Sequence, residues 1–144
     1  MKTILIFSSL NFLFAASLLG QDSKKFPGKD ESCLYHYDSV QQRTIYDFAE
    51  EKAIFPGGER ALFIFIQEHL KYSGADCKEG TVFVQFVVEA DGSISHKSVR
   101  KSLNSDLEKE AMRVIDQMPD WLPAKCEGKK VPCLVILPIT FKRK

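Results

Sequence analysis

The stretch from Gly80 to Arg100 constrains the possible fold of this chain more than any other segment. In its first half the apolar residues Val82, Val84, Phe86 and Val88 fall on one parity, and Thr81, Gln85 and Glu89 fall on the other. This alternation predicts a half-buried β-strand. Asp91-Gly92 then predicts a hairpin turn, because these residue types tolerate a positive φ. Ile94 and Val99 of the returning strand have opposite parity, so both can face the core only across a β-bulge.

Two helices are expected around this hairpin. The apolar run within Glu59–Tyr72 could form a buried strand, but its length and the recurrence of Leu62, Ile66 and Leu70 at every fourth position favour a helix that Gly57 or Gly58 caps. The second helix begins with the capping-box spacing of Ser105 and Glu108 and ends before Pro119. Its apolar stripe consists of Leu107, Ala111, Val114, Ile115 and Met118.

A last strand is expected over Val131–Phe141, where Cys133, Val135, Leu137, Ile139 and Phe141 share one side. Pro138 lacks the amide hydrogen of a ladder donor, which favours an edge strand or a bulge. The predicted fold class is α+β, with two helices on a three-stranded antiparallel sheet. A right-handed crossover gives the strand order 2-1-3, with the last strand at an edge.

The first residues predict a secretory signal. Lys2 precedes an uncharged run over residues 3–19, and a cleaved signal peptide of residues 1–20 is expected. An uncleaved membrane anchor is the alternative, and membrane contact is expected only in that case. Without residues 1–20, basic and acidic side chains balance at 19 each, which argues against nucleic acid as a partner.

Enzymatic motifs are not evident in the sequence. His36, His69 and His96 have no nucleophile or carboxylate in a catalytic arrangement nearby, and no phosphate-binding loop follows a strand. We expect no catalytic residues, no cofactor and no small-molecule substrate. Trp121 lies between two prolines and is expected to anchor the edge of the core, with a partner contact as the alternative.

Four cysteines are present, Cys33, Cys77, Cys126 and Cys133. In an exported chain they predict two disulfides, and their number alone leaves three connectivities open. No metal site is expected, because the cysteine spacing differs from that of zinc sites.

The order of several motifs resembles the C-terminal domain of TonB-family energy transducers, in the form common in the Bacteroidetes. The motifs are Phe55-Pro56-Gly57-Gly58, the alternating strand from Gly80, Asp91-Gly92-x-Ile94, Glu110-Ala111-x-Arg113-Val114, Met118-Pro119-x-Trp121-x-Pro123-Ala124, Gly128-Lys129-x-Val131 and Leu137-Pro138-Ile139-x-Phe141. The resemblance covers about residues 53–142 and implies a non-enzymatic periplasmic module. It implies docking on a TonB-dependent outer-membrane receptor, whose TonB-box peptide adds as a strand beside the last strand and contributes to transport.

This resemblance and the predicted topology define the expected organisation and site. Residues 21–53 are expected to be an extended polar lead-in, and residues 54–144 to be the domain. The partner-binding residues are expected to be Leu134, Val135, Ile136, Leu137, Ile139 and Phe141, with pairing fullest over Leu134–Leu137. Residues 21–53 could instead fold back over this edge. A stand-alone, disulfide-stabilised secreted module with another envelope partner is the alternative function.

The 2-1-3 topology also predicts the disulfide pairing. It places Cys77 before the first strand, far from Cys126 and Cys133, which flank the turn into the last strand. Since a disulfide requires α-carbons within about 7 Å, Cys126–Cys133 and Cys33–Cys77 are the expected bridges.

Overall fold

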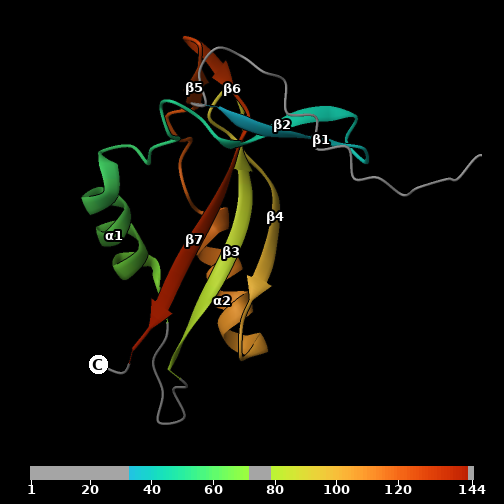
Figure 1. The fold of residues 1–144 in the computed structure, drawn as a ribbon. Helices are drawn as coiled ribbons and strands as arrows, with labels where there is room; N and C mark the ends of the chain where they lie inside the picture. Colours follow the sequence, from blue (N-terminus) through green and yellow to red (C-terminus); the bar gives the residue numbers. More distant parts are fainter. Residues whose placement is uncertain (1–32, 72–78, 143–144) are drawn as a thin grey trace, which may run out of the picture.

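The computed structural model describes residues 33–71 and 79–142, which form an α+β fold with two helices and a mixed five-stranded sheet (Figure 1). The sheet order is β1-β2-β7-β3-β4, and β5 and β6 form a separate two-stranded ribbon. The elements are β1 (Leu34–Asp38), β2 (Arg43–Phe48), α1 (Gly58–His69), β3 (Gly80–Val88), β4 (Ile94–Lys101), α2 (Ser105–Asp116), β5 (Ala124–Cys126), β6 (Lys129–Val131) and β7 (Cys133–Phe141).

Strand β3 lies at the centre of the fold. It pairs with β4 on one side and β7 on the other, both antiparallel. The four apolar side chains of its predicted inner face, Val82, Val84, Phe86 and Val88, are fully buried. They share one core with α2, whose stripe of Leu107, Ala111, Val114 and Ile115 is also buried and whose neighbour Met118 packs against it. The parity and the stripe expected from the sequence are confirmed.

The β3–β4 hairpin contains the expected bulge. Val87 pairs with Ser95 and Gln85 pairs with Ser98, so two β4 residues stand opposite Phe86. One of these two residues, His96, has a φ of 50°. The extra residue restores the inward direction of the strand, and both Ile94 and Val99 pack against the core.

Both expected helices form, but the cap of the second is corrected. Gly57 caps α1 in the left-handed region, with a φ of 85°. Asn104, and not Ser105, caps α2, because its side-chain oxygen accepts a hydrogen bond from the Asp106 amide at 2.7 Å. Ser105 is the first helical residue, so the expected capping box begins one residue too late.

The three-stranded antiparallel sheet is too small a prediction. Strand β3 does lie between β4 and β7, but β2 joins β7 in parallel and β1 joins β2. These two strands lie in the segment expected to be an extended lead-in. They form a hairpin whose turn is fixed by Asp38, which accepts hydrogen bonds from the amides of Val40 and Gln41 at 2.9 and 3.1 Å. Strands of only five and six residues leave little periodicity in the sequence.

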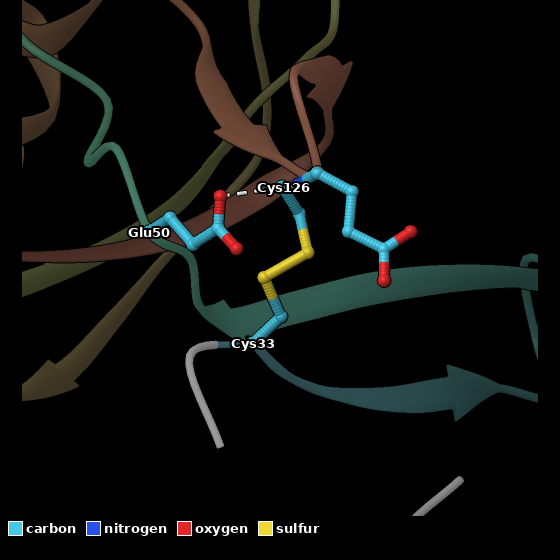
Figure 2. The surroundings of a disulfide bond; sticks show 4 residues. Cys33, Glu50 and Cys126 are labelled. Atoms are coloured by element: carbon cyan, nitrogen blue, oxygen red, sulfur yellow. Dashed lines mark hydrogen bonds between the residues drawn. A yellow bond between two sulfur atoms is a disulfide. The ribbon is translucent and has the colours of Figure 1, made fainter. Parts of the chain in front are cut away.

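The disulfide pairing expected from the topology is wrong. Cys33 is bonded to Cys126, across a sequence separation of 93 and an α-carbon distance of 6.3 Å (Figure 2). Cys133 is a buried free thiol. Cys77 lies outside the described residues. The error arises because the β1–β2 hairpin carries Cys33 to the β5–β6 ribbon, a contact that an extended lead-in would not make.

No helix among residues 33–71 and 79–142 is long and apolar enough to cross a membrane. The expected signal peptide of residues 1–20 and residues 143–144 at the other end lie outside the described part of the chain.

Candidate functional site

The outer edge of β7 is unpaired over most of its length. On its inner side β7 pairs with β3 along the whole strand, from Val88↔Cys133 to Gly80↔Phe141. On its outer side it meets β2 at one position, Tyr46↔Cys133, where the Tyr46 amide donates to the Pro132 carbonyl oxygen at 2.9 Å. Within the described part of the chain, no strand pairs with this side beyond Cys133. An unpaired row of amides and carbonyls is a template for another strand.

Two observations show which backbone groups point to this open edge. The amide and carbonyl of one residue point to the same side of a strand, and successive residues alternate. Pro132 points outward because its carbonyl accepts from β2. Pro138 has the same parity, and its lack of an amide hydrogen costs no ladder bond when it faces outward. Leu134, which follows the contact with β2, has this outward parity, and beyond it the outward groups are the carbonyls of Ile136, Pro138 and Thr140 and the amides of Ile136 and Thr140.

The side chains of β7 also alternate, between the two faces of the sheet. Leu137, Ile139 and Phe141 are buried on the helix-covered side of the sheet, and Val135 packs against that core. Ile136 is 48% exposed on the other side. The Thr140 hydroxyl lies 3.1 Å from the Thr81 hydroxyl of β3 on that same side.

The expected partner-binding residues fall into two groups, according to whether their backbone groups point outward or toward β3. Leu134 and Ile136 have outward backbone groups, whereas Val135, Leu137, Ile139 and Phe141 direct theirs toward β3. Those four residues do not offer hydrogen bonds to a partner, and they contribute to the candidate site by pairing β7 with β3. Pro138 and Thr140 have outward groups that the sequence interpretation missed. The phase of Pro138 could have identified them, since a proline in a paired strand marks the outward set.

The β1–β2 hairpin is held against β3 by a charged pair. Arg43 Nη1 and Nη2 donate to Glu89 Oε2 and Oε1 at 2.6 and 2.7 Å, a bidentate geometry. Hydrogen bonds from Arg43 and Ser95 hold the pKa of Glu89 below its usual value, against the opposing effect of partial burial. Glu89 in turn raises the pKa of Arg43. Both charges are thus satisfied within the fold, and they position β2 beside the start of β7.

The histidines have structural partners. His36 Nδ1 lies 2.9 Å from Asp47 Oδ2 across the β1–β2 hairpin. His69 stacks on Phe65 at a centroid distance of 3.9 Å. His96 Nδ1 lies 2.8 Å from Ser95 Oγ and 3.2 Å from Arg43 Nη2. No group of His, Cys, Asp and Glu side chains suited to a metal ion occurs among the described residues.

Cys133 and Trp121 complete the surroundings of the edge. Burial raises the pKa of the Cys133 thiol, with a smaller contribution from Asp47. Trp121 is 6% exposed and packs edge-on against Phe55 and Phe86, at centroid distances of 5.7 and 5.4 Å. It is an anchor of the core, as expected.

Comparison with known proteins gives a family match for residues 75–143. No significant match was found among curated proteins or among solved structures. Residues 75–143 match the family described as Gram-negative bacterial TonB protein C-terminal. The match spans β3 to β7 and therefore the whole open edge, while α1 and the β1–β2 hairpin precede it. Residues 75–143 thus belong to the TonB C-terminal domain family, as the motifs in the sequence indicate.

Proposed function

We propose that this chain is a periplasmic TonB-family binding module. It docks on a TonB-dependent outer-membrane receptor by accepting the receptor's TonB-box peptide as a strand along β7, and it contributes to receptor-mediated transport without being an enzyme. The observation that carries this proposal is the unpaired outer edge of β7 within a TonB C-terminal domain.

The chemistry of the edge supports this mode of binding. Main-chain hydrogen bonds supply affinity in strand addition, and side chains at alternate positions supply specificity. Two outward amides and three outward carbonyls are available over residues 136–140. The exposed Ile136 side chain lies beside them, so an apolar residue of the partner strand can pack on it across the new ladder.

A proline substitution at the edge tests this proposal. Ile136→Pro removes an outward amide, and the neighbouring Pro138 shows that β7 accepts a proline in this phase. Ile136→Thr is the matched control, because it removes the same apolar side chain but keeps the amide. We expect binding of a synthetic TonB-box peptide, measured by calorimetry, to weaken at least about tenfold for Ile136→Pro relative to Ile136→Thr. Equal affinities of the two variants would contradict strand addition at this edge.

Amide exchange tests whether the edge is free. Residues 33–53 do fold back to β7, but they pair with it only beside Cys133. We therefore expect fast exchange at Ile136 and Thr140 in the isolated protein and slow exchange after the peptide is added. Slow exchange before addition, unchanged by the peptide, would mean that the edge is already occupied.

The alternative function is that of a stand-alone secreted module with another envelope partner. The Cys33–Cys126 bridge favours an oxidising compartment and agrees with either function. A photo-reactive amino acid at position 136, used in intact cells, distinguishes them. Cross-links to an outer-membrane receptor support docking on that receptor, and reproducible cross-links to a different envelope protein alone support the alternative.

A further inference from the structure

The outer edge of β7 can pair with one neighbouring strand. We call the space beside this edge the lane, and β2 already occupies its first position, beside Cys133. Neighbouring strands lie about 4.8 Å apart, so two chains cannot pair with the same backbone groups from the same side. Tyr46 of β2 pairs with Cys133 in parallel and donates its amide to the Pro132 carbonyl oxygen, and a parallel pair centred on Cys133 uses the outward groups of residues 132 and 134. A strand added to β7 must therefore end before the part of β7 that pairs with Tyr46.

The chain leaves β7 directly after this contact. β2 runs parallel to β7 but pairs with it at a single position and then continues toward the β5 segment. There, Glu51 and Lys125 exchange backbone hydrogen bonds of 3.1 and 2.9 Å, and Ile54 bridges Leu122. The occupied part of the lane is therefore short and sharply bounded.

Independent anchors fix the hairpin at this position. The Cys33–Cys126 disulfide ties the residue before β1 to β5. The Arg43–Glu89 pair ties β2 to the residue after β3. Figure 2 shows a further link beside the disulfide, where the Glu127 amide donates to Glu50 Oε2 at 3.2 Å. A partner that displaces the hairpin must therefore act against a covalent bond and a bidentate ion pair.

Aromatic packing adds bulk at the same place. Tyr46 contacts Tyr35 of β1, with ring centroids 5.3 Å apart. The two rings belong to adjacent strands of the hairpin, and desolvation of Tyr46 raises the pKa of its phenol. A chain advancing along β7 would meet both the backbone and this ring pair.

We propose that the β1–β2 hairpin is a fixed stop that sets where a partner strand ends on β7. It limits the partner to a short extended peptide segment that pairs with residues 136–140 and excludes it from the backbone of Leu134. This inference rests on the proposed function and adds the register and length of the bound segment. The disulfide and the Arg43–Glu89 pair keep the hairpin beside β7, and the hydrogen bond from the Tyr46 amide to Pro132 holds Tyr46 against the β7 backbone.

Residue-resolved amide exchange with a synthetic TonB-box peptide tests the stop. The reference protein carries only Cys77→Ser, which prevents new bridges, and otherwise has the wild-type sequence. It is compared with a variant that adds Cys33→Ser, Cys126→Ser and Arg43→Gln and so lacks both anchors. In the reference protein with its disulfide formed, the peptide is expected to slow amide exchange at Ile136 and Thr140. Amide exchange at Leu134 and Tyr46 is expected to stay unchanged. In the anchor variant, Leu134 is expected to exchange at least about tenfold faster without peptide and to become protected with it.

A second variant covers the case in which loss of both anchors unfolds the protein. Tyr46→Pro keeps the disulfide and the ion pair but removes the amide that donates to Pro132, and Tyr46→Phe is its control. We expect peptide protection to extend to Leu134 in Tyr46→Pro and not in Tyr46→Phe.

The outcomes separate this inference from the proposed function. If the peptide protects Ile136 and Thr140 but accelerates Tyr46 exchange in the reference protein, the hairpin is a displaceable cover and the stop is refuted. Protection that never extends to Leu134 in either hairpin variant also refutes it. If the peptide protects no β7 amide in any of the proteins, both the proposed function and the stop are overturned.

Discussion

Gly92 of the hairpin turn lies directly against the backbone of Trp121, whose amide donates to the Gly92 carbonyl oxygen at 2.8 Å. Gly92 has a φ of 93°, and a β-carbon at this position would overlap the Trp121 carbonyl oxygen. The β3–β4 turn therefore fixes the segment that carries the aromatic anchor of the core. Only glycine satisfies both the backbone angle and the close approach.

Gly92→Ala is expected to lower the free energy of unfolding by more than about 3 kcal/mol, because backbone strain and a backbone overlap act together. Gly128→Ala is the matched control. Gly128 has a φ of 72°, and a β-carbon there would meet no atom of the described residues within 4 Å, so only the left-handed strain of about 1–2 kcal/mol applies. Urea unfolding followed by Trp121 fluorescence measures both. Equal losses would show that the contact with Trp121 is unimportant.

Glu89 is expected to make stability depend on acid pH. Its pKa is lowered in the folded protein, chiefly by Arg43, so the contribution is present above the unfolded value of about 4.3 and is lost as pH falls through the folded pKa. Glu89→Gln should cost about 1 kcal/mol at pH 7 and progressively less toward pH 3.

Thermal unfolding of wild type and Glu89→Gln between pH 7 and pH 3 measures this difference. Glu68→Gln, at an exposed position of α1, controls for the loss of one negative charge. A gap between wild type and Glu89→Gln that stays constant on acidification would contradict the assigned role of the Arg43–Glu89 pair.

Phe86 is expected to be a principal core residue. It is a fully buried residue of β3 that packs edge-on against Trp121. Phe86→Ala should lower the free energy of unfolding by about 3–5 kcal/mol. Phe63→Ala removes the same side chain from α1, where it is 62% exposed, and should cost under about 1 kcal/mol. Chemical unfolding of both variants gives the comparison. A loss under about 1 kcal/mol for Phe86→Ala would reverse the assigned parity of β3.

Cys133 is expected to resist alkylation in the folded protein. Its thiol is buried and its raised pKa lowers the fraction of reactive thiolate at neutral pH. In a Cys77→Ser background, iodoacetamide should modify Cys133 slowly until urea unfolds the chain. Non-reducing peptide mapping should recover Cys33 joined to Cys126. Rapid labelling of Cys133 without denaturant, or its recovery in a disulfide, would contradict this arrangement.

Local patterns in the sequence determined the central part of this fold. The alternation from Val82 to Val88 and the stripe from Leu107 to Ile115 are confirmed, because periods of two and of about 3.6 follow from backbone geometry alone. The opposite parity of Ile94 and Val99 likewise predicted the bulge at His96 and Lys97. Pro138 also indicated which alternate residues of β7 direct their backbone groups to the open edge, since a missing amide hydrogen is tolerated only on the unpaired side.

Tertiary structure alone decided how that edge is bounded. β2 meets β7 at one residue pair, Tyr46↔Cys133, and one pair leaves no periodic signal in either segment. The choice of Cys126 as the partner of Cys33 depends on the same hairpin, across a sequence separation of 93. Sequence patterns report which face of a segment is buried. They do not report which distant segment occupies the adjacent lane, because that choice depends on contacts between residues far apart in the chain.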